Sequence, residues 1–147
     1  MKILSYSVDP RLASVASKAA KEWNKTLADI VFLKEASYGD IVIKFGKIDT
    51  EKYPSRVAQC NREGTSWITW SIILGDHIKW RTSWLERTFG SGENALTALV
   101  HEFGHVFGLP HALNPNYVMH FEMGGYGSLS KAERENYRQY ILENPNF

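Results

Sequence analysis

The sequence predicts an α+β domain in which helices pack on one sheet. Segments rich in β-branched and aromatic residues, which are typical of strands, dominate the first half of the chain. Two segments with helical periodicity follow, separated by a long irregular stretch over residues 108–128. The 147 residues, 44% of them hydrophobic, suffice to bury one core. We therefore expect a single domain built on one sheet.

Local patterns place the elements in order. A strand over residues 3–8 is followed by Asp9 as N-cap and Pro10 at the first position of a helix that reaches about Lys25. Further strands are predicted over residues 30–33, 41–45, 56–60 and 67–74, whereas residues 80–89 show no clear preference. Ser130 and Glu133 form a capping box that begins a last helix extending to about residue 142.

The segment HEFGHVFGLPH, residues 101–111, carries the strongest functional signal. Periodicity predicts a helix with Ser91 as N-cap and its last apolar residues near position 107. His101 and His105 are four residues apart, so both imidazoles lie on one face and can reach a single ion. Gly108 can adopt positive φ, end the helix and return His111 to the ion as third ligand.

The spacing also indicates what the ion does. Three protein ligands leave the fourth tetrahedral position of a zinc ion to water, as in catalytic rather than structural sites. Glu102 lies about 100° round the helix from His101. It points beside the metal, where it can act on a zinc-bound water without being a ligand.

The extended motif resembles that of the metzincin clan of zinc peptidases, and most closely that of a minimal matrixin catalytic domain. Met119, in the sequence NYVMH, matches the methionine of the clan's Met-turn, which packs beneath the three imidazoles. Residues 40–45, DIVIKF, are similar to a matrixin strand. The resemblance implies a twisted, mixed sheet with one antiparallel edge strand, three main helices, an N-terminal part over residues 1–108 and a small C-terminal part over 109–147.

The resemblance also suggests where substrate binds. Residues 56–60 would form the edge strand, with 67–74 as the rival, so Val57 and Ala58 would offer their backbone to an extended peptide. Residues 112–126 would form the outer wall of the pocket for the residue after the scissile bond. The side chains predicted to contribute to this wall are Tyr117, Val118, Phe121 and Glu122. An apolar wall that carries one acid predicts cleavage before Leu, Met, Phe or Tyr and rejection of Asp and Glu.

Three departures from the clan refine these expectations. Phe121 stands where some members carry a metal-binding tyrosine, so no tyrosine switch is expected. Residues 46–64 contain no histidine, so one catalytic zinc and no second zinc is expected, while calcium stays open. Matrixins follow the Met-turn with a Pro-x-Tyr stretch, which is replaced here by residues 120–126, and this leaves the specificity pocket open.

Composition argues against nucleic acid and membranes as partners, and it does not indicate the cellular compartment. The formal net charge is +1 and the basic residues are scattered, so neither nucleic acid nor a membrane surface is an expected partner. No apolar run approaches the ~18 residues that span a bilayer. Cys60 is the one cysteine and reads as a small buried hydrophobe. We expect a monomer that is either intracellular or the trimmed mature form of an exported protein, with no inhibitory pro-segment before the first strand.

The favoured function is a zinc-dependent endopeptidase that hydrolyses peptide bonds through a zinc-bound water activated by Glu102. Two alternatives remain. One is a zinc-ordered binding module that recognises a peptide without cutting it, for which His120 or Glu122 would supply a fourth ligand. The other is an unrelated zinc hydrolase that acts on a non-peptide substrate.

Overall fold

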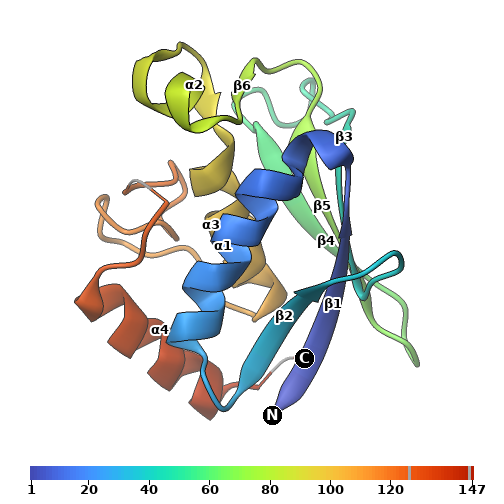
Figure 1. Cartoon of the computed structure of the whole chain (residues 1–147), viewed down its shortest axis with the longest axis vertical. Helices are drawn as coiled ribbons and strands as arrows, with labels where there is room; N and C mark the ends of the chain where they lie inside the picture. The colour runs from blue at the N-terminus through green and yellow to red at the C-terminus, as the bar shows by residue number, and fades with distance from the viewer. Residues whose placement is uncertain (126, 146) are drawn as a thin grey trace.

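A five-stranded twisted sheet forms one side of the molecule (Figure 1). The computed structural model describes residues 1–125, 127–145 and 147. The strands are β1 (Lys2–Val8), β2 (Val31–Glu35), β3 (Ile41–Gly46), β4 (Ala58–Glu63) and β5 (Thr69–Gly75), in the spatial order β2-β1-β3-β5-β4. All neighbours pair in parallel except β4, which is antiparallel to β5 at the edge. The expected mixed sheet with one antiparallel edge strand is confirmed.

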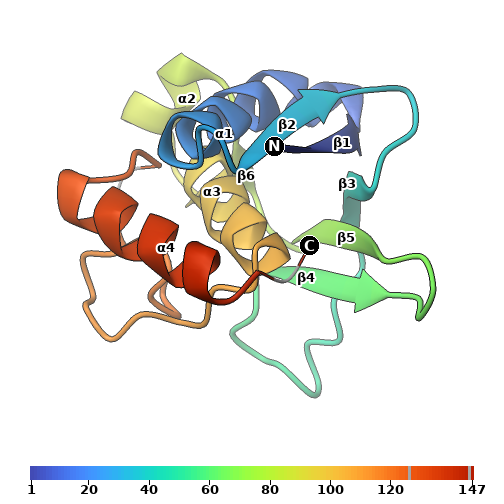
Figure 2. The ribbon, with the colours of Figure 1, turned by 90° about the horizontal axis from the view of Figure 1, so that it is seen from below.

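Three long helices lie on one side of this sheet (Figure 2). They are α1 (Ala13–Thr26), α3 (Ala95–Val106) and α4 (Lys131–Glu143), and a 3-10 turn, η1 (Pro10–Leu12), precedes α1. α1 and α3 pack against each other and against the strands, whereas α4 contacts α1 on the side away from the sheet. The order of elements thus places α3 between the sheet and the C-terminal segment.

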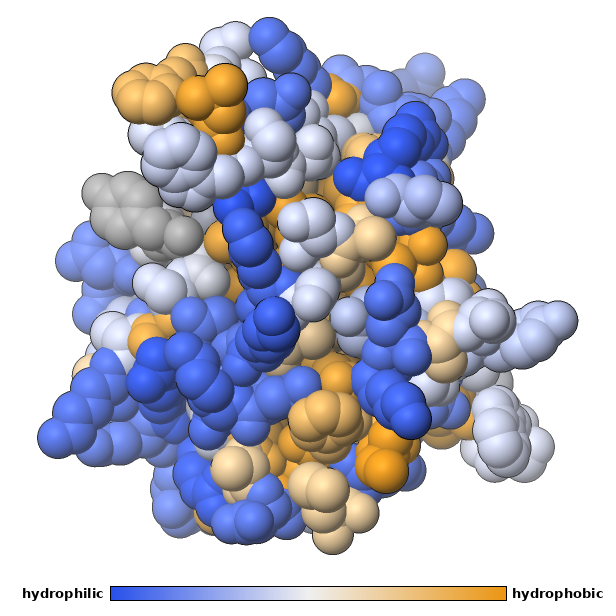
Figure 3. All heavy atoms as spheres, in the orientation of Figure 1, coloured by the Kyte–Doolittle hydropathy of each residue, from blue (hydrophilic) through white to orange (hydrophobic). Residues whose placement is uncertain are grey.

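The region between β5 and α3, which includes residues 80–89 without a clear predicted preference, contains a short helix and a small sheet. Strands β6 (Trp80–Arg81) and β7 (Glu93–Asn94) pair in parallel around α2 (Trp84–Phe89). No side chain of α2 is buried, and Trp84, Leu85 and Phe89 are largely exposed. Figure 3 shows hydrophobic side chains at this corner, at the upper left of the view.

Two predicted boundaries were wrong, for local reasons. The N-cap of the zinc-site helix is Asn94 and not Ser91, because the Asn94 side chain accepts hydrogen bonds from the N–H groups of Leu96 and Thr97 while the pairing of β7 with β6 keeps residues 93–94 extended. The edge strand begins at Ala58, because residues 49–56 form turns held by the bond from Arg56 N–H to the Tyr53 carbonyl. The rival segment, now β5, lies inside the sheet.

The core lies between the sheet and the two packed helices and fixes the position of α3. Alternate strand residues face inward, which explains why Leu4, Ile41 and Ile72 are almost completely buried. The indole N–H of Trp23, on α1, donates to the Val100 carbonyl of α3 at 2.9 Å. α3 also packs against β5 and against the edge strand β4. Within the described residues, no helix combines the length and apolar character needed to cross a bilayer.

Candidate active site

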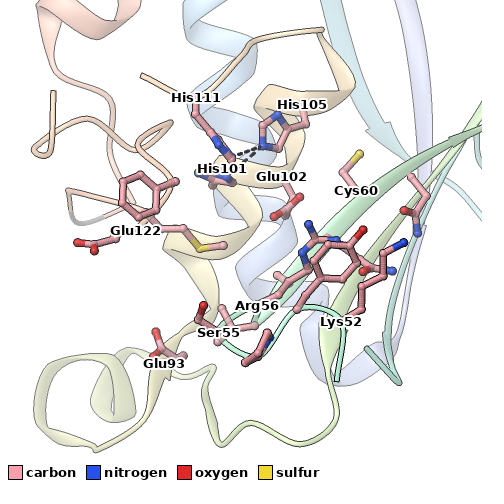
Figure 4. A pocket seen from close by; sticks show the side chains of 18 residues that line it. Lys52, Ser55, Arg56, Cys60, Glu93, His101, Glu102, His105, His111 and Glu122 are labelled. Carbon is pink, nitrogen blue, oxygen red and sulfur yellow. Dashed lines mark hydrogen bonds between the residues drawn. The ribbon is translucent and has the colours of Figure 1, made fainter. Parts of the chain in front are cut away.

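Three histidines converge on one point at the open end of α3 (Figure 4). His101 and His105 project from adjacent turns of the helix, and His111 reaches the same point from the segment that follows. The Nε2 atom of His105 lies 3.1 Å from that of His101 and 3.2 Å from that of His111. Nitrogens of three ligands around a zinc ion at 2.0–2.1 Å would be separated by about 3.3 Å in tetrahedral geometry. The spacing fits zinc.

The other ring nitrogens are occupied in a way that suits metal binding. His101 Nδ1 lies 2.6 Å from the Val118 carbonyl and His105 Nδ1 lies 2.9 Å from the Leu109 carbonyl. A carbonyl can only accept, so these bonds place the proton on Nδ1 and leave the Nε2 lone pairs facing one another. Burial lowers the pKa of His101 to about 4 and also lowers the pKa values of His105 and His111, which keeps the imidazoles neutral.

The turn after α3 returns the third histidine as its sequence predicts. Gly108 has φ 85°, a conformation that costs glycine little, and its N–H donates to the His105 carbonyl. Leu109 N–H then bonds the Gly104 carbonyl, which closes the helix end. Ala112 N–H donates to the Met119 carbonyl at 2.8 Å and ties this segment to the predicted Met-turn.

Glu102 lies beside the three imidazoles in the wall of the cavity (Figure 4). Its side chain is 2% exposed, and Oε2 has no hydrogen-bond partner among the described residues. Burial raises the pKa of Glu102 to about 8, although the positive charge of Arg56 acts in the opposite direction. A divalent cation held by the histidines would lower that pKa again by direct charge attraction. The carboxylate is therefore adjacent to the histidine cluster and available to a water between them.

Met119 is fully buried against the zinc helix, as the Met-turn resemblance implies. A Cβ built on Gly104 would overlap Met119 Sδ, so any larger residue at this helix position would require the Met119 side chain to shift. Gly104 was not singled out from the sequence. The sequence does carry a signal for Gly104, because it lies between the two histidines that are four residues apart on the helix.

Glu133 is a second residue that the sequence assigned only to a helix cap. Its Oε1 accepts from Ser130 N–H within the capping box, but its Oε2 accepts from Val118 N–H at 2.9 Å and from the Tyr137 hydroxyl at 3.2 Å. Glu133 is 3% exposed. Glu133 thus holds the N–H of Val118, the residue whose carbonyl orients His101.

A cavity of roughly 790 Å³ runs past the histidines, between β4 with its preceding loop and the Met-turn segment. Of the predicted substrate-contacting residues, it is lined by Val57, Ala58, Phe121 and Glu122. Tyr117 and Val118 are not among the lining residues, and the Val118 side chain is fully buried. The predicted pocket wall extends to Tyr126, which lies outside the described residues.

The cavity also contains residues that the sequence did not single out. Lys52 and Arg56 lie in the loop before β4, and Glu93 comes from β7. Cys60, read as a buried hydrophobe, is half-buried and lines the cavity, and burial raises the pKa of its thiol to about 12. Only tertiary folding brings these side chains to the histidines, because each lies at least seven residues from the zinc motif along the chain.

Comparison with known proteins agrees with the geometry. The family model described as Matrixin, Peptidase_M10, matches residues 4–134. A search of curated protein sequences finds no match. The matched residues span most of the chain and include every zinc-site histidine, the neighbouring glutamate and the Met-turn. With catalytic zinc implied by the family and a histidine triad that fits it, this chain belongs to the matrixin family of zinc metalloendopeptidases.

Proposed function

We propose that Glu102 is the general base and later the general acid of peptide-bond hydrolysis, at a zinc ion held by His101, His105 and His111. The observation that carries this proposal is the buried Oε2 of Glu102, which lacks a partner and lies next to the converging Nε2 atoms. The ion, when bound, supplies a Lewis acid that polarises the scissile carbonyl and acidifies water. Glu102 takes the proton of the attacking water and delivers it to the leaving amine.

The surrounding chain supports these roles by fixing orientation. The Val118 and Leu109 carbonyls hold His101 and His105 in the tautomer that leaves Nε2 free. Met119 fills the space beneath the histidines against Gly104. The unpaired edge of β4 borders the cavity, and Ala58 is proposed to pair there with the backbone of an extended peptide. The Val57 carbonyl already accepts from Gly75 N–H within the sheet, so Val57 is proposed to contribute its side chain to the cavity wall.

An enzyme is favoured over the binding module that the sequence left open. Among the described residues, the cluster able to hold a metal contains the three histidines, without His120 or Glu122. His120 Nδ1 instead accepts a hydrogen bond from Glu122 N–H at 3.2 Å. A zinc ion held by these three histidines would keep one coordination position for water or substrate, as catalysis requires. The substrates of the family are peptides or proteins.

The two proposed parts form one catalytic domain, residues 1–108 and 109–147. A single buried cluster supports this, since it contains residues of β1, α3, the Met-turn and α4, among them Leu4, Phe103, Met119 and Ile141. A monomer that binds no nucleic acid remains the prediction for the assembly.

Substitution Glu102→Gln tests the catalytic role. Cleavage of a proteome-derived peptide mixture should fall by the ~10²–10⁴-fold that one general acid/base contributes, because the amide cannot accept the proton. Zinc content and melting temperature should stay near those of the parent, since Glu102 is not a ligand. The matched control is Glu93→Gln, which changes an exposed glutamate that lines the same cavity and should retain activity. Retention of more than about a tenth of parent activity by Glu102→Gln would remove Glu102 from the role.

A further inference from the structure

The loop before β4 presents two cations to the cavity. Arg56 is half-buried, and its guanidinium carbon lies 3.6 Å from the centre of the Tyr53 ring. Lys52 Nζ lies 5.3 Å from the centre of the same ring. Both side chains line the cavity that contains the zinc-site histidines (Figure 4). Stacking on the tyrosine holds the guanidinium in place and reduces the entropy lost when it binds a ligand.

Neither cation is used to hold the fold together. Ion pairs among the described residues involve Arg11, Lys25 and Arg134, and neither Lys52 nor Arg56 forms one. The guanidinium also makes no hydrogen bond within the described part of the chain, so its five N–H donors remain available to a ligand.

The acids of the cavity lie elsewhere. Figure 4 shows Glu93 and Glu122 on the side away from Lys52 and Arg56. Glu102 faces Arg56 from the zinc helix, but its carboxylate is farther than ion-pair distance. Glu102 and Arg56 attract each other at this longer range, but no carboxylate of the described residues pairs directly with the guanidinium, so an entering anion can approach it within the same cavity as the histidines.

We propose that Arg56, assisted by Lys52, binds a carboxylate of the peptide substrate within the few residues that flank the scissile bond. A planar guanidinium matches a carboxylate with two parallel hydrogen bonds, which gives geometric as well as charge selectivity. The subsite is separate from the wall that carries Phe121 and Glu122, where an apolar residue is expected. Arg56 is thus a specificity-determining residue, and this inference rests on the proposed peptidase function.

The carboxylate has two possible sources with the same chemistry, the side chain of Asp or Glu and the C-terminus of a short peptide. Two sets of fluorogenic peptides separate them. One set places Glu or Gln in turn at each of three positions on either side of an apolar cleavage site, with both termini blocked. The other set carries no acidic side chain and compares a free C-terminal carboxylate with its amide at increasing distance from the bond.

The peptides are tested with the zinc-loaded parent, Arg56→Gln and a control, Arg11→Gln. Arg11 also stacks on an aromatic ring, that of Phe45, but does not line the cavity. In the parent, kcat/KM should be about tenfold higher at one position for Glu than for Gln, or for a free C-terminal carboxylate than for its amide. This is the typical effect of a charge-assisted hydrogen bond. Arg56→Gln should reduce this ratio to about one while cleavage of the uncharged peptides changes little, and Arg11→Gln should keep the parent ratio.

Several outcomes would overturn the inference. A parent that cleaves the peptides without preference for a carboxylate refutes the subsite but leaves the peptidase proposal intact, whereas a parent that cleaves no peptide refutes the peptidase proposal itself. An equal loss on charged and uncharged peptides in Arg56→Gln would assign Arg56 to support of the fold or the reaction centre. If Arg56→Gln does not fold, the parent enzyme provides the test. Its preference for a carboxylate must weaken as salt increases from ~0.05 to ~0.5 M, and a preference that salt does not change refutes the inference.

Discussion

The floor and the walls of the cleft are built by different physical means. The floor is α3, whose Val100 and Phe103 are completely buried and whose histidines are oriented by backbone carbonyls. The segment predicted to form the outer wall, residues 112–126, is rich in turns in its described part, and its Leu113 is 97% exposed and its Phe121 64% exposed. Substitutions in the floor therefore disturb packing and the metal, whereas substitutions in the wall change what binds. Chemistry and specificity can vary separately in this molecule.

Removal of the ligand that lies outside the helix gives the largest expected effect. His111→Ala should weaken zinc binding by more than the ~10–100-fold that follows loss of an outer partner, because a direct ligand is lost. Competition with a chelator measures the affinity, and metal analysis of the dialysed parent should find one zinc per chain. His77→Ala, in the turn after β5, is the control. Unchanged retention in His111→Ala would mean that another group, with His120 the first candidate, completes the site.

Overpacking the floor should come next. Gly104→Ala places a methyl group against Met119 and within 3.2 Å of the Trp23 ring, and such insertions cost ~1–3 kcal/mol of unfolding free energy. Leu113→Ala in the exposed wall should change stability by no more than ~0.5 kcal/mol. Denaturant unfolding of the two variants, both loaded with zinc, measures the contrast. Equal stabilities would show that floor and wall do not differ in the way proposed.

The smallest effect is expected for the charge on the wall. Glu122 is exposed and lines the cavity, so Glu122→Gln should relax the predicted rejection of Asp and Glu after the scissile bond by a few-fold, with no change in melting temperature. The cleavage profile of the peptide mixture, compared with that of the parent, provides the test. A parent that prefers acids at this position would contradict the pocket assignment, and an unchanged profile would place Glu122 outside the pocket.

The sequence predicted the elements whose signals are local. His101, His105 and His111 follow from helical spacing and a glycine turn, and the family resemblance identified β4 as the edge strand. The start of α3 was missed because β7 pairs with β6 and excludes Ser91 from the cap, a contact that no local pattern encodes.

The contacts that complete the site depend on the tertiary fold. Arg56 is brought to the cavity by turns that precede the edge strand, and its position depends on the stacking with Tyr53. The inner role of Glu133 could not be separated from its role in the capping box, because the same carboxylate serves both. Its Oε2 atom can accept the hydrogen bond from Val118 N–H only when α4 packs beside the Met-turn.

The link from Glu133 through the Val118 peptide to His101 has a consequence for the timing of maturation. The carboxylate holds the Val118 N–H, and the carbonyl of the same residue orients the imidazole. A chain emerging from the ribosome carries all three metal ligands before α4 is available, but it lacks the anchor that fixes one of them. We therefore expect high-affinity zinc binding to require residues 131–143 in their docked position as well as the three histidines.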